Sequence, residues 1–439
     1  MSGPEAPWLP EVLRAQKRGL AQGLYSICSA NPFVLEAAML QARADGSAVC
    51  IESTSNQVNP EGGYTGQTPA DFVSFVREIA RAMDFPFARV LLGGDHLGPF
   101  PWQDQDARTA MDKARETVRD YVLAGYAKIH LDASMRCADD PPGPLADATV
   151  TERASELCAV AEEAAGRRTA SAPLPLYVIG TEVPVPGGEQ EAVAELLATK
   201  VEDAERTLAL HRTAFARRGL EGAWPRVVGL VVQPGVEFGD TTVFAYDRSR
   251  IVALKRFIAD TDGIVFEAHS TDYQTGSALR ALVEDHFAIL KVGPALTFAF
   301  REAVFALAEI EREWLSGRKG AVVSDLRNVL EHVMLEKPGH WQRYYHGDAE
   351  ALRIARSFSL SDRIRYYWAQ PAVAEALRHL LANLTAHPAP SSLLSQYLPE
   401  PNGAPRRDRI QAEPRNLIRA KVREVTETYA RACGTKPGC

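Results

Sequence analysis

The chain has 439 residues, of which 46% are hydrophobic and 24% charged, and its formal net charge is −7 at pH 7. This composition is ordinary for a globular protein, and the mild acidity argues against nucleic-acid binding because no basic patch dominates. Residues 1–10 show no secretory signal, no run of about 18 apolar residues occurs, and six scattered cysteines form no CxxC pair. We therefore expect a cytoplasmic protein without a membrane span and with reduced cysteines.

Short β-branched runs alternate with amphipathic stretches of helical length eight times along the chain. A capping residue precedes proline at Asn31-Pro32 and at Thr68-Pro69, which is typical of a helix start. Eight such units in about 290 residues predict an α/β fold, a (β/α)8 TIM barrel, rather than a doubly wound sheet. The predicted strands are residues 23–30, 48–54, 88–95, 127–133, 175–183, 226–235, 263–270 and 287–293.

The remainder of the chain has a different character, because it is helical and interrupted by prolines. We expect a barrel over residues 1–316 and a helical C-terminal extension over residues 317–439 that packs on it. Within the extension, residues 401–408 are predicted to form an exposed loop and residues 413–432 a final helix.

Polar side chains gather near the carboxyl ends of the predicted strands. In TIM barrels the active site lies at that end. One buried histidine or aspartate is often a structural group, but seven or eight strands with such residues predict a working site. The side chains concerned are Glu52, Asp95, His96, His130, Asp132, Glu182, Gln233, Glu267, His269 and Lys291.

Two of these histidines suit a divalent metal, because neutral imidazoles are good ligands for transition metals. We expect His96 and His269 to bind it, with Glu182, Gln233 or Glu267 completing the ligand set. A metal beside a carboxylate is a standard combination for making an enediolate from a hydroxyketone.

Asp95 is the expected proton carrier, and it directly precedes His96. Consecutive strand residues point to opposite sides, so the loop must turn there if both are to face the site. His130 lies one strand step deeper, and a structural hydrogen bond is at least as good a reading of it as a functional role. Cys28 is interpreted as a small buried hydrophobic residue.

A phosphate site is expected near the last two strands, where barrels often bind phosphate. Lys291, Ser270 and the Gly293-Pro294 turn lie there. The loops at residues 56–69 and 181–189 are long and rich in glycine, as is common for loops that carry specificity. Further candidates for binding substrate are Asn56, Gln57, Arg301, Arg363 and Arg365. Residues 359–368 are predicted either to clamp the barrel mouth or to pack the extension.

Long blocks along the chain carry a resemblance to a known family. The blocks are SICSANP, IESTSNQVNPEGGYTGQTPADF, LGGDHLGP, KIHLDASM, YVIGTEVPVPGGE, VVQPGVEF, FEAHSTDYQT, FAILKVGPALTFAFREAVFAL and SLSDRIRYYW. With them the chain resembles the GatZ/KbaZ-type subunit family of D-tagatose-1,6-bisphosphate aldolase from about residue 26 to about residue 399. Members of this family have been labelled tagatose 6-phosphate kinases, non-catalytic subunits of a class II aldolase, and 4-epimerases of hexulose 6-phosphates.

The chain is more distantly similar to class II aldolases, and that resemblance implies roles for three residues. Asp95 would shuttle a proton, while His96 and His269 would bind zinc. The third zinc histidine of those enzymes has no counterpart here, because Gln233 stands at that place. Glu182, Gln233 or Glu267 would have to substitute for it.

We expect a metal-dependent 4-epimerase that interconverts D-tagatose 6-phosphate and D-fructose 6-phosphate by retro-aldol and aldol steps. The alternative is a non-catalytic accessory subunit of a class II D-tagatose-1,6-bisphosphate aldolase. A nucleotide is not expected, and the kinase label is disfavoured, because the sequence has no GxxxxGK[ST] loop. Zinc is the favoured metal, with manganese and magnesium as alternatives, and a homo-oligomer is compatible with the sequence. The expected catalytic residues are Asp95, Asp132, Glu182 and Glu52.

Overall fold

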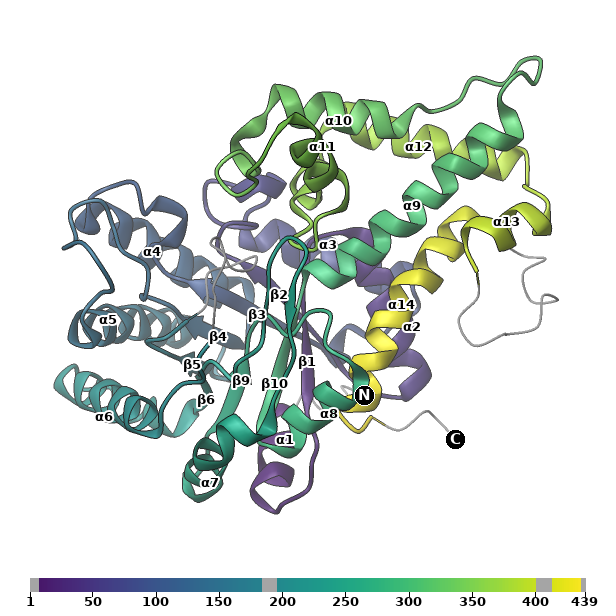
Figure 1. Cartoon of the computed structure of the whole chain (residues 1–439). Coiled ribbons are helices and arrows are strands. Elements are labelled where there is room, and N and C mark those ends of the chain that lie inside the picture. Colours follow the sequence, from purple (N-terminus) through teal and green to yellow (C-terminus); the bar gives the residue numbers. More distant parts are fainter. Residues whose placement is uncertain (1–7, 184–195, 400–412, 436–439) are drawn as a thin grey trace.

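The computed structural model describes residues 8–183, 196–399 and 413–435. Eight parallel strands close into a barrel in the order β1–β10–β9–β6–β5–β4–β3–β2, which confirms the predicted TIM barrel (Figure 1). Each predicted strand range contains or overlaps one of them. The barrel strands are β1 (Leu24–Cys28), β2 (Val49–Thr54), β3 (Val90–Leu97), β4 (Lys128–Leu131), β5 (Leu176–Ile179), β6 (Val227–Val231), β9 (Val265–Ala268) and β10 (Phe287–Val292).

Helices follow the strands and cover the outside of the barrel. The two predicted helix starts are confirmed: the Asn31 side chain accepts hydrogen bonds from the amides of Phe33 and Val34, and Thr68 forms a capping box with Asp71. The covering helices are α2 (Pro32–Asp45), α3 (Pro69–Ala82), α4 (Ala107–Ala124), α5 (Asp147–Gly166), α6 (Val201–Arg217), α7 (Val252–Asp260), α8 (Gly276–Glu284) and α9 (Pro294–Leu315).

A first helix, α1 (Trp8–Lys17), closes the amino-terminal end of the barrel. Leu9 and Leu13 on this helix pack against apolar side chains at or near the start of the strands. This helix was not predicted from the sequence. Its packing covers the amino-terminal end of the barrel, and the cavity lined by the histidines lies at the opposite end.

The middle of the barrel is ionic, although such interiors are usually filled by branched aliphatic side chains. Glu52, Lys128 and Glu267 point inward from β2, β4 and β9, and each is fully buried. The aliphatic core lies instead between the strands and the surrounding helices.

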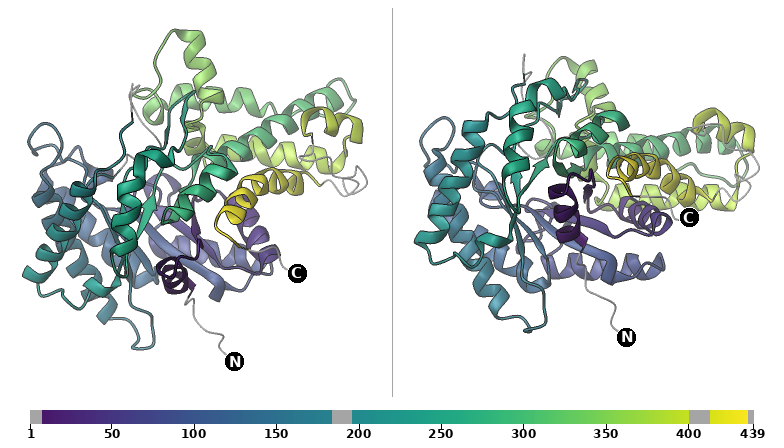
Figure 2. Two further views of the ribbon diagram at one scale, coloured as in Figure 1. Left: turned by 60° about the horizontal axis from the view of Figure 1, so that its bottom comes forward. Right: turned by 90° about the horizontal axis from the view of Figure 1, so that it is seen from below.

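The chain continues beyond α9 into further helices that extend to one side of the barrel (Figure 2). The final helix predicted over residues 413–432 is present, and it packs against α2, α8 and α9. The division at residue 316 into two domains stays a prediction. These helices are α10 (Leu326–Glu336), α11 (Ala349–Phe358), α12 (Pro371–Ala386), α13 (Ser391–Tyr397) and α14 (Pro414–Ala432).

A short 3-10 helix, η7 (Arg363–Tyr367), brings the extension to the barrel mouth. Asp362, just before it, is buried and forms an ion pair with Arg301 of α9 at 3.1 Å. Asp240, between the short strands β7 (Glu237–Phe238) and β8 (Val243–Phe244), accepts hydrogen bonds from Ser359 and Ser361. Residues 359–368 therefore both pack the extension and face the mouth.

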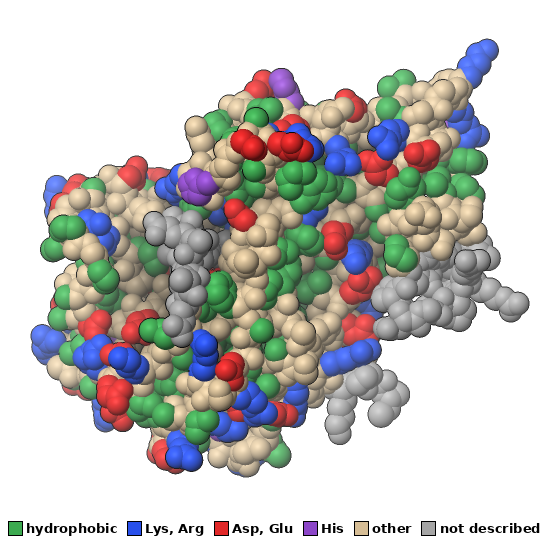
Figure 3. Space-filling model, viewed as in Figure 1, with side chains coloured by type: hydrophobic (Ala, Val, Ile, Leu, Met, Phe, Trp, Pro, Cys, Tyr) green, Lys and Arg blue, Asp and Glu red, His purple; other side chains and the backbone are tan. Residues whose placement is uncertain are grey.

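Two predicted loops lie wholly or partly outside the described residues. Residues 401–408 are outside them entirely, and the loop at 181–189 is described only as far as residue 183. On the face drawn in Figure 3, acidic and basic side chains are interspersed, and neither sign dominates that face. Among the described residues, no helix is long and apolar enough to cross a membrane.

The turn after β3 leaves no room for a side chain at Gly98. A Cβ atom there would lie 1.6 Å from the carbonyl oxygen of Asp132. We expect Gly98→Ala to lower the free energy of unfolding by about 3 kcal/mol, because the backbone would have to move. Denaturant unfolding measures this. Gly166→Ala is the matched control, since a Cβ at Gly166 meets nothing within 4 Å and should leave stability unchanged or slightly raised.

Candidate metal centre

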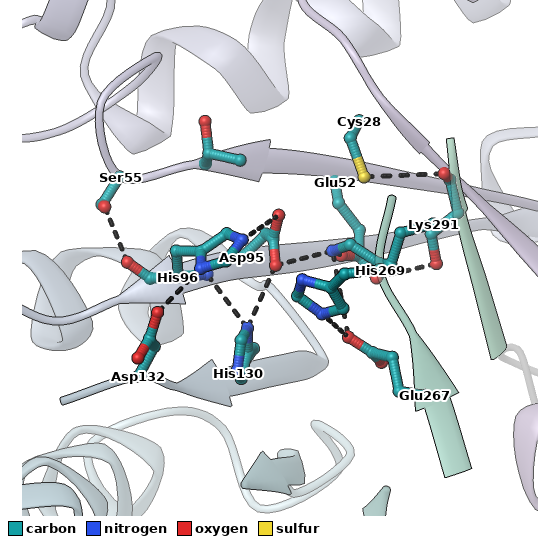
Figure 4. Close-up of polar contacts among 12 residues, drawn as sticks. Cys28, Glu52, Ser55, Asp95, His96, His130, Asp132, Glu267, His269 and Lys291 are labelled. Atoms are coloured by element: carbon teal, nitrogen blue, oxygen red, sulfur yellow. Dashed lines mark hydrogen bonds and ion pairs between the residues drawn. The ribbon is translucent and has the colours of Figure 1, made fainter. Parts of the chain in front are cut away.

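Three histidines converge at the carboxyl end of the barrel (Figure 4). His96 comes from β3, His130 from β4 and His269 from the residue after β9. Their ring centroids are 4.9 to 5.2 Å apart. One ligand atom from each of these imidazoles and one oxygen of Asp95 lie within 4.8 Å of one another. This spacing is compatible with a shared metal ion, whose bonds to nitrogen are about 2.1 Å long.

The backbone turns at His96, as the order Asp95-His96 requires. His96 has φ of +48°, in the left-handed region that residues other than glycine rarely adopt. This turn lets two consecutive side chains face the same centre. Glycine at position 93 leaves room for the Glu52 side chain to pack against β3, because a Cβ at Gly93 would lie 2.6 Å from Glu52 Cγ.

Each imidazole has one ring nitrogen against a carboxylate. His96 Nδ1 lies 2.7 Å from Asp132 Oδ2, and His269 Nε2 lies 2.9 Å from Glu267 Oε1. His130 Nδ1 lies 3.1 Å from Asp95 Oδ1. Behind His96 and His269, carboxylates in this position hold the rings in orientation and leave the other nitrogen free to bind a metal.

A chain of ion pairs lies beneath the histidines. Lys128 Nζ is 2.7 Å from both Glu52 Oε1 and Glu267 Oε2. Lys291 Nζ bonds to the second oxygen of Glu52 and lies 2.6 Å from Asp95 Oδ1. The two lysines therefore link the carboxylate that supports His269 to the carboxylate expected to carry a proton.

These charges are buried, and their balance is negative. The barrel holds four carboxylates, Glu52, Asp95, Asp132 and Glu267, and two ammonium groups, Lys128 and Lys291, and all six residues are at most 4% exposed. The carboxylates therefore outnumber the lysines by two. Because an uncompensated buried charge is strongly unfavourable, the cluster calls for additional positive charge.

The pKa directions agree with this balance. Burial alone would raise the pKa of Asp95, but His96 and Lys291 hold it well below its usual range. Burial would lower the pKa of His96, but Asp95 and Asp132 raise it. Burial lowers the pKa of Lys291, yet Asp95 and other nearby anions raise it well above its usual range. Asp95 and Lys291 are thus charged at neutral pH.

The residues present fit a divalent metal. His130 turns Nδ1 toward the cluster, where it accepts a hydrogen bond from the His96 amide at 3.2 Å and lies 3.1 Å from Asp95. The donor set of three imidazoles and a carboxylate is suited to zinc or another first-row metal, and a dication would match the two negative charges in excess.

A cavity opens above the histidines at the barrel mouth. Most residues predicted to bind substrate or metal line it, and so does the proposed proton carrier Asp95. Tyr64 and Tyr366 also line it, with ring centroids 4.7 Å apart. The predicted residues in its wall are Asn56, Gln57, Asp95, His96, His269, Ser270, Lys291 and Arg365.

Other predicted residues lie elsewhere. Glu52, Asp132 and Glu267 lie beneath the cavity and contact its lining residues rather than the space itself. Glu182 is exposed and accepts a hydrogen bond from Thr199.

Gln233 Oε1 accepts hydrogen bonds from the amides of Gly235 and Val236, so it stabilises its own loop. The described structure brings neither Glu182 nor Gln233 to the histidines.

The predicted phosphate ligands are divided between two places. Arg365 lines the cavity, whereas Arg363 faces a neighbouring one. Lys291 lines the cavity, but three carboxylates surround its ammonium group. At the start of α9 the amides of Gly293 and Ala295 donate to Asp272, so a carboxylate already occupies the expected anion position.

Lys128 was not predicted from the sequence, and the role of His130 was left open between a structural and a functional group. His130 and Asp132 were expected on one face of β4, and His130 lies beside Asp95 and His96 in the cluster. Lys128 precedes His130 by two residues and shares that face. Side chains two residues apart in a strand share a face, and this rule could have placed Lys128 on the inner face of β4 with His130.

A family model described as D-tagatose-1,6-bisphosphate aldolase subunit GatZ/KbaZ-like matches residues 9–434. A solved structure titled a probable tagatose 6 phosphate kinase from Sinorhizobium meliloti 1021 is 47% identical to this chain. The match covers 94% of this chain and 100% of that chain, with a TM-score of 0.85.

Two aldolases of known structure are more distant. The YdjI aldolase from Escherichia coli K12 is 11% identical, with a TM-score of 0.42 over 87% of this chain and 96% of that chain. A fructose-bisphosphate aldolase from Campylobacter jejuni is 14% identical, with a TM-score of 0.43 over 86% of this chain and 92% of that chain.

The cluster generates a prediction about metal affinity. We expect His96→Ala, His130→Ala and His269→Ala each to weaken zinc or manganese binding at least about 100-fold, because each removes one donor. Titration calorimetry on metal-free protein measures this. His211→Ala is the control, since His211 is buried on α6 and bonds to the Thr207 carbonyl, away from the cluster. Unchanged affinity in the His130 variant would remove that residue from the ligand set.

Proposed function

The chain belongs to the D-tagatose-1,6-bisphosphate aldolase subunit GatZ/KbaZ-like family, and on that basis we propose that it is a metal-dependent hexulose-phosphate 4-epimerase. It would interconvert D-tagatose 6-phosphate and D-fructose 6-phosphate. The observation that supports this most is the convergence of three imidazoles and Asp95, of which His96, His269 and Asp95 line the mouth cavity, above a buried excess of negative charge.

His96, His130 and His269 would hold the metal, with Asp95 beside them. When bound, such a metal polarises the carbonyl and neighbouring hydroxyl oxygens of a ketose. Asp132 and Glu267 act as positioning residues, because they orient two of the three imidazoles. Glu182 and Gln233, which lie away from the cluster, have no part in this ligand set.

Asp95 carries the proton. Its carboxylate is ionised and takes the proton from the hydroxyl on carbon 4, while the bond between carbons 3 and 4 breaks. The electron pair of that bond becomes part of an enediolate, and carbon 4 becomes an aldehyde. After the aldehyde turns over, the bond forms again on its other face, and Asp95 returns the proton to the new hydroxyl.

Lys291 stabilises the charge that moves during this exchange. Its ammonium group lies 2.6 Å from Asp95 Oδ1 and lines the same cavity. A fixed cation in a water-poor site favours a developing anion more than it would in bulk water. Glu52 holds Lys291 in place, and Lys128 holds Glu52.

The phosphate end must stay anchored while the aldehyde turns. After cleavage the 6-phosphate remains on the aldehyde fragment, so its anchor keeps the two fragments together. Arg365, Ser270 and Gln57 line the cavity, Gln57 from the loop after β2. Arg365 has no ion-pair partner among the described residues and donates to Tyr366 Oη at 2.8 Å. A guanidinium without a carboxylate partner can bind a phosphate through two of its N–H groups.

A second candidate is an accessory subunit of a class II aldolase, which the word "subunit" in the family description favours. Such a protein would need no proton carrier. The kinase name belongs to the Sinorhizobium meliloti protein, and the present sequence contains no P-loop.

Turnover of the chain alone separates these functions. With zinc or manganese we expect it to interconvert the two hexulose 6-phosphates, and Asp95→Asn to lower kcat by about 10² to 10⁴ because the general base is lost. Asp139→Asn is the control, since Asp139 lies on an exposed loop and bonds to the Ala107 amide. No turnover by the wild-type chain, together with stimulation of an added aldolase, would favour the accessory role.

Anchoring by Arg365 is tested with and without the phosphate. We expect Arg365→Met to raise KM for D-fructose 6-phosphate at least about tenfold, because a charge-assisted hydrogen bond is worth about 1.5 to 3 kcal/mol. The KM for unphosphorylated D-fructose should stay the same. Steady-state kinetics with both sugars measures the difference, and an equal effect on both would show that Arg365 does not bind the phosphate.

A further inference from the structure

A second cavity lies at the barrel mouth, beside the one above the histidines. Its volume is about 710 Å³, and Tyr64 and Tyr366 separate the two because both line each of them. The wall of the second cavity is formed by the loop after β2, the 3-10 helix η3 (Phe100–Trp102), the segment around His340 and the start of η7.

Arg363 is the unusual residue in this wall. It is 4% exposed, its Nε donates to the carbonyl of His340, and its guanidinium carbon lies 3.1 Å from the centre of the Tyr344 ring. Within the described parts of the chain, no carboxylate pairs with it.

Other buried arginines have such a partner. Arg301 and Arg356 are 3% and 6% exposed and pair with Asp362 and Glu331. Because a buried charge without a counter-ion is costly, Arg363 calls for an anion from outside the chain.

The surroundings of Arg363 add positive rather than negative charge. Arg343 lines the same cavity, donates to Tyr344 Oη at 2.7 Å and also has no carboxylate partner among the described residues. Of the acidic side chains in the wall, Glu61 is taken by Lys113 at 2.7 Å and by the Trp102 indole at 2.9 Å. Asp104 is exposed to solvent.

We propose that this cavity binds the phosphate group of a small phosphorylated metabolite, with Arg343 and Arg363 as its ligands. Two uncompensated guanidinium groups match the charge of a phosphate monoester, which is close to −2 at neutral pH. The cavity is larger than a phosphate needs, and the half-buried side chains of Phe100 and Pro101 in its wall offer apolar surface to the organic part of a ligand. The site goes beyond the proposed epimerase, because no step of that reaction uses it.

Calorimetric titration of the full chain with D-fructose 6-phosphate and with inorganic phosphate tests the site. A chelator is present throughout, so that the result does not depend on the metal centre or on turnover. The wild-type chain should show two classes of phosphate sites, one at Arg365 and one in this cavity. We expect Arg343→Ala to weaken the cavity class at least about tenfold for both ligands and to leave the other class, and Arg363→Met to do the same. Arg343 is exposed, so its variant should fold even if the Arg363 variant does not.

Two controls complete the experiment. Arg77→Ala removes an exposed arginine that stacks on Phe87 and should change nothing. Arg365→Met removes the guanidinium on the other side of the Tyr64–Tyr366 pair, and one class of sites should remain in that variant. Loss of all phosphate binding in the Arg365 variant, or unchanged binding in the Arg343 variant, would overturn the proposal. If the cavity also contacts the sugar, D-fructose 6-phosphate binds more tightly than inorganic phosphate. Equal affinity for the two ligands would reject that contact.

Discussion

The ion pairs of Lys128 inside the barrel are the interaction on which the site depends. This lysine has no exposed surface, and its ammonium group lies 2.7 Å from Glu52 and 2.7 Å from Glu267. Each of these carboxylates uses its other oxygen to hold a residue of the cavity, Lys291 in one case and His269 in the other. Removing one charge from this set would leave its partners buried and unpaired, so the position of each group constrains the others.

The same arrangement explains why the centre favours a cation. Apolar packing lies outside the strands, α1 covers the lower end, and the cavity above the cluster opens at the mouth. In such surroundings an excess of two carboxylates is strongly unfavourable unless positive charge is added. The three imidazoles supply the nitrogen donors, and the carboxylates behind them fix the rings. The fold and the electrostatics therefore favour the histidine cluster as the place where a metal could bind.

Much of this could be predicted from the sequence, and the failures have physical reasons. Strand alternation and the rule that barrel sites lie at the carboxyl ends predicted the fold and the place of the cavity. Glu182 and Gln233 were expected at the centre, but β5 ends at Ile179 and β6 at Val231, so both residues lie on loops beyond the barrel. Lys128 opens its strand, where a lysine is usually exposed, and only three-dimensional pairing reveals its role.

Diffraction from a crystal grown with manganese or zinc tests the central claim most directly, because anomalous scattering locates the metal without reference to activity. The account predicts one strong peak per chain within bonding distance of nitrogen atoms of His96, His130 and His269. A peak elsewhere in the protein, with these three imidazoles free of metal at a saturating concentration, would contradict it.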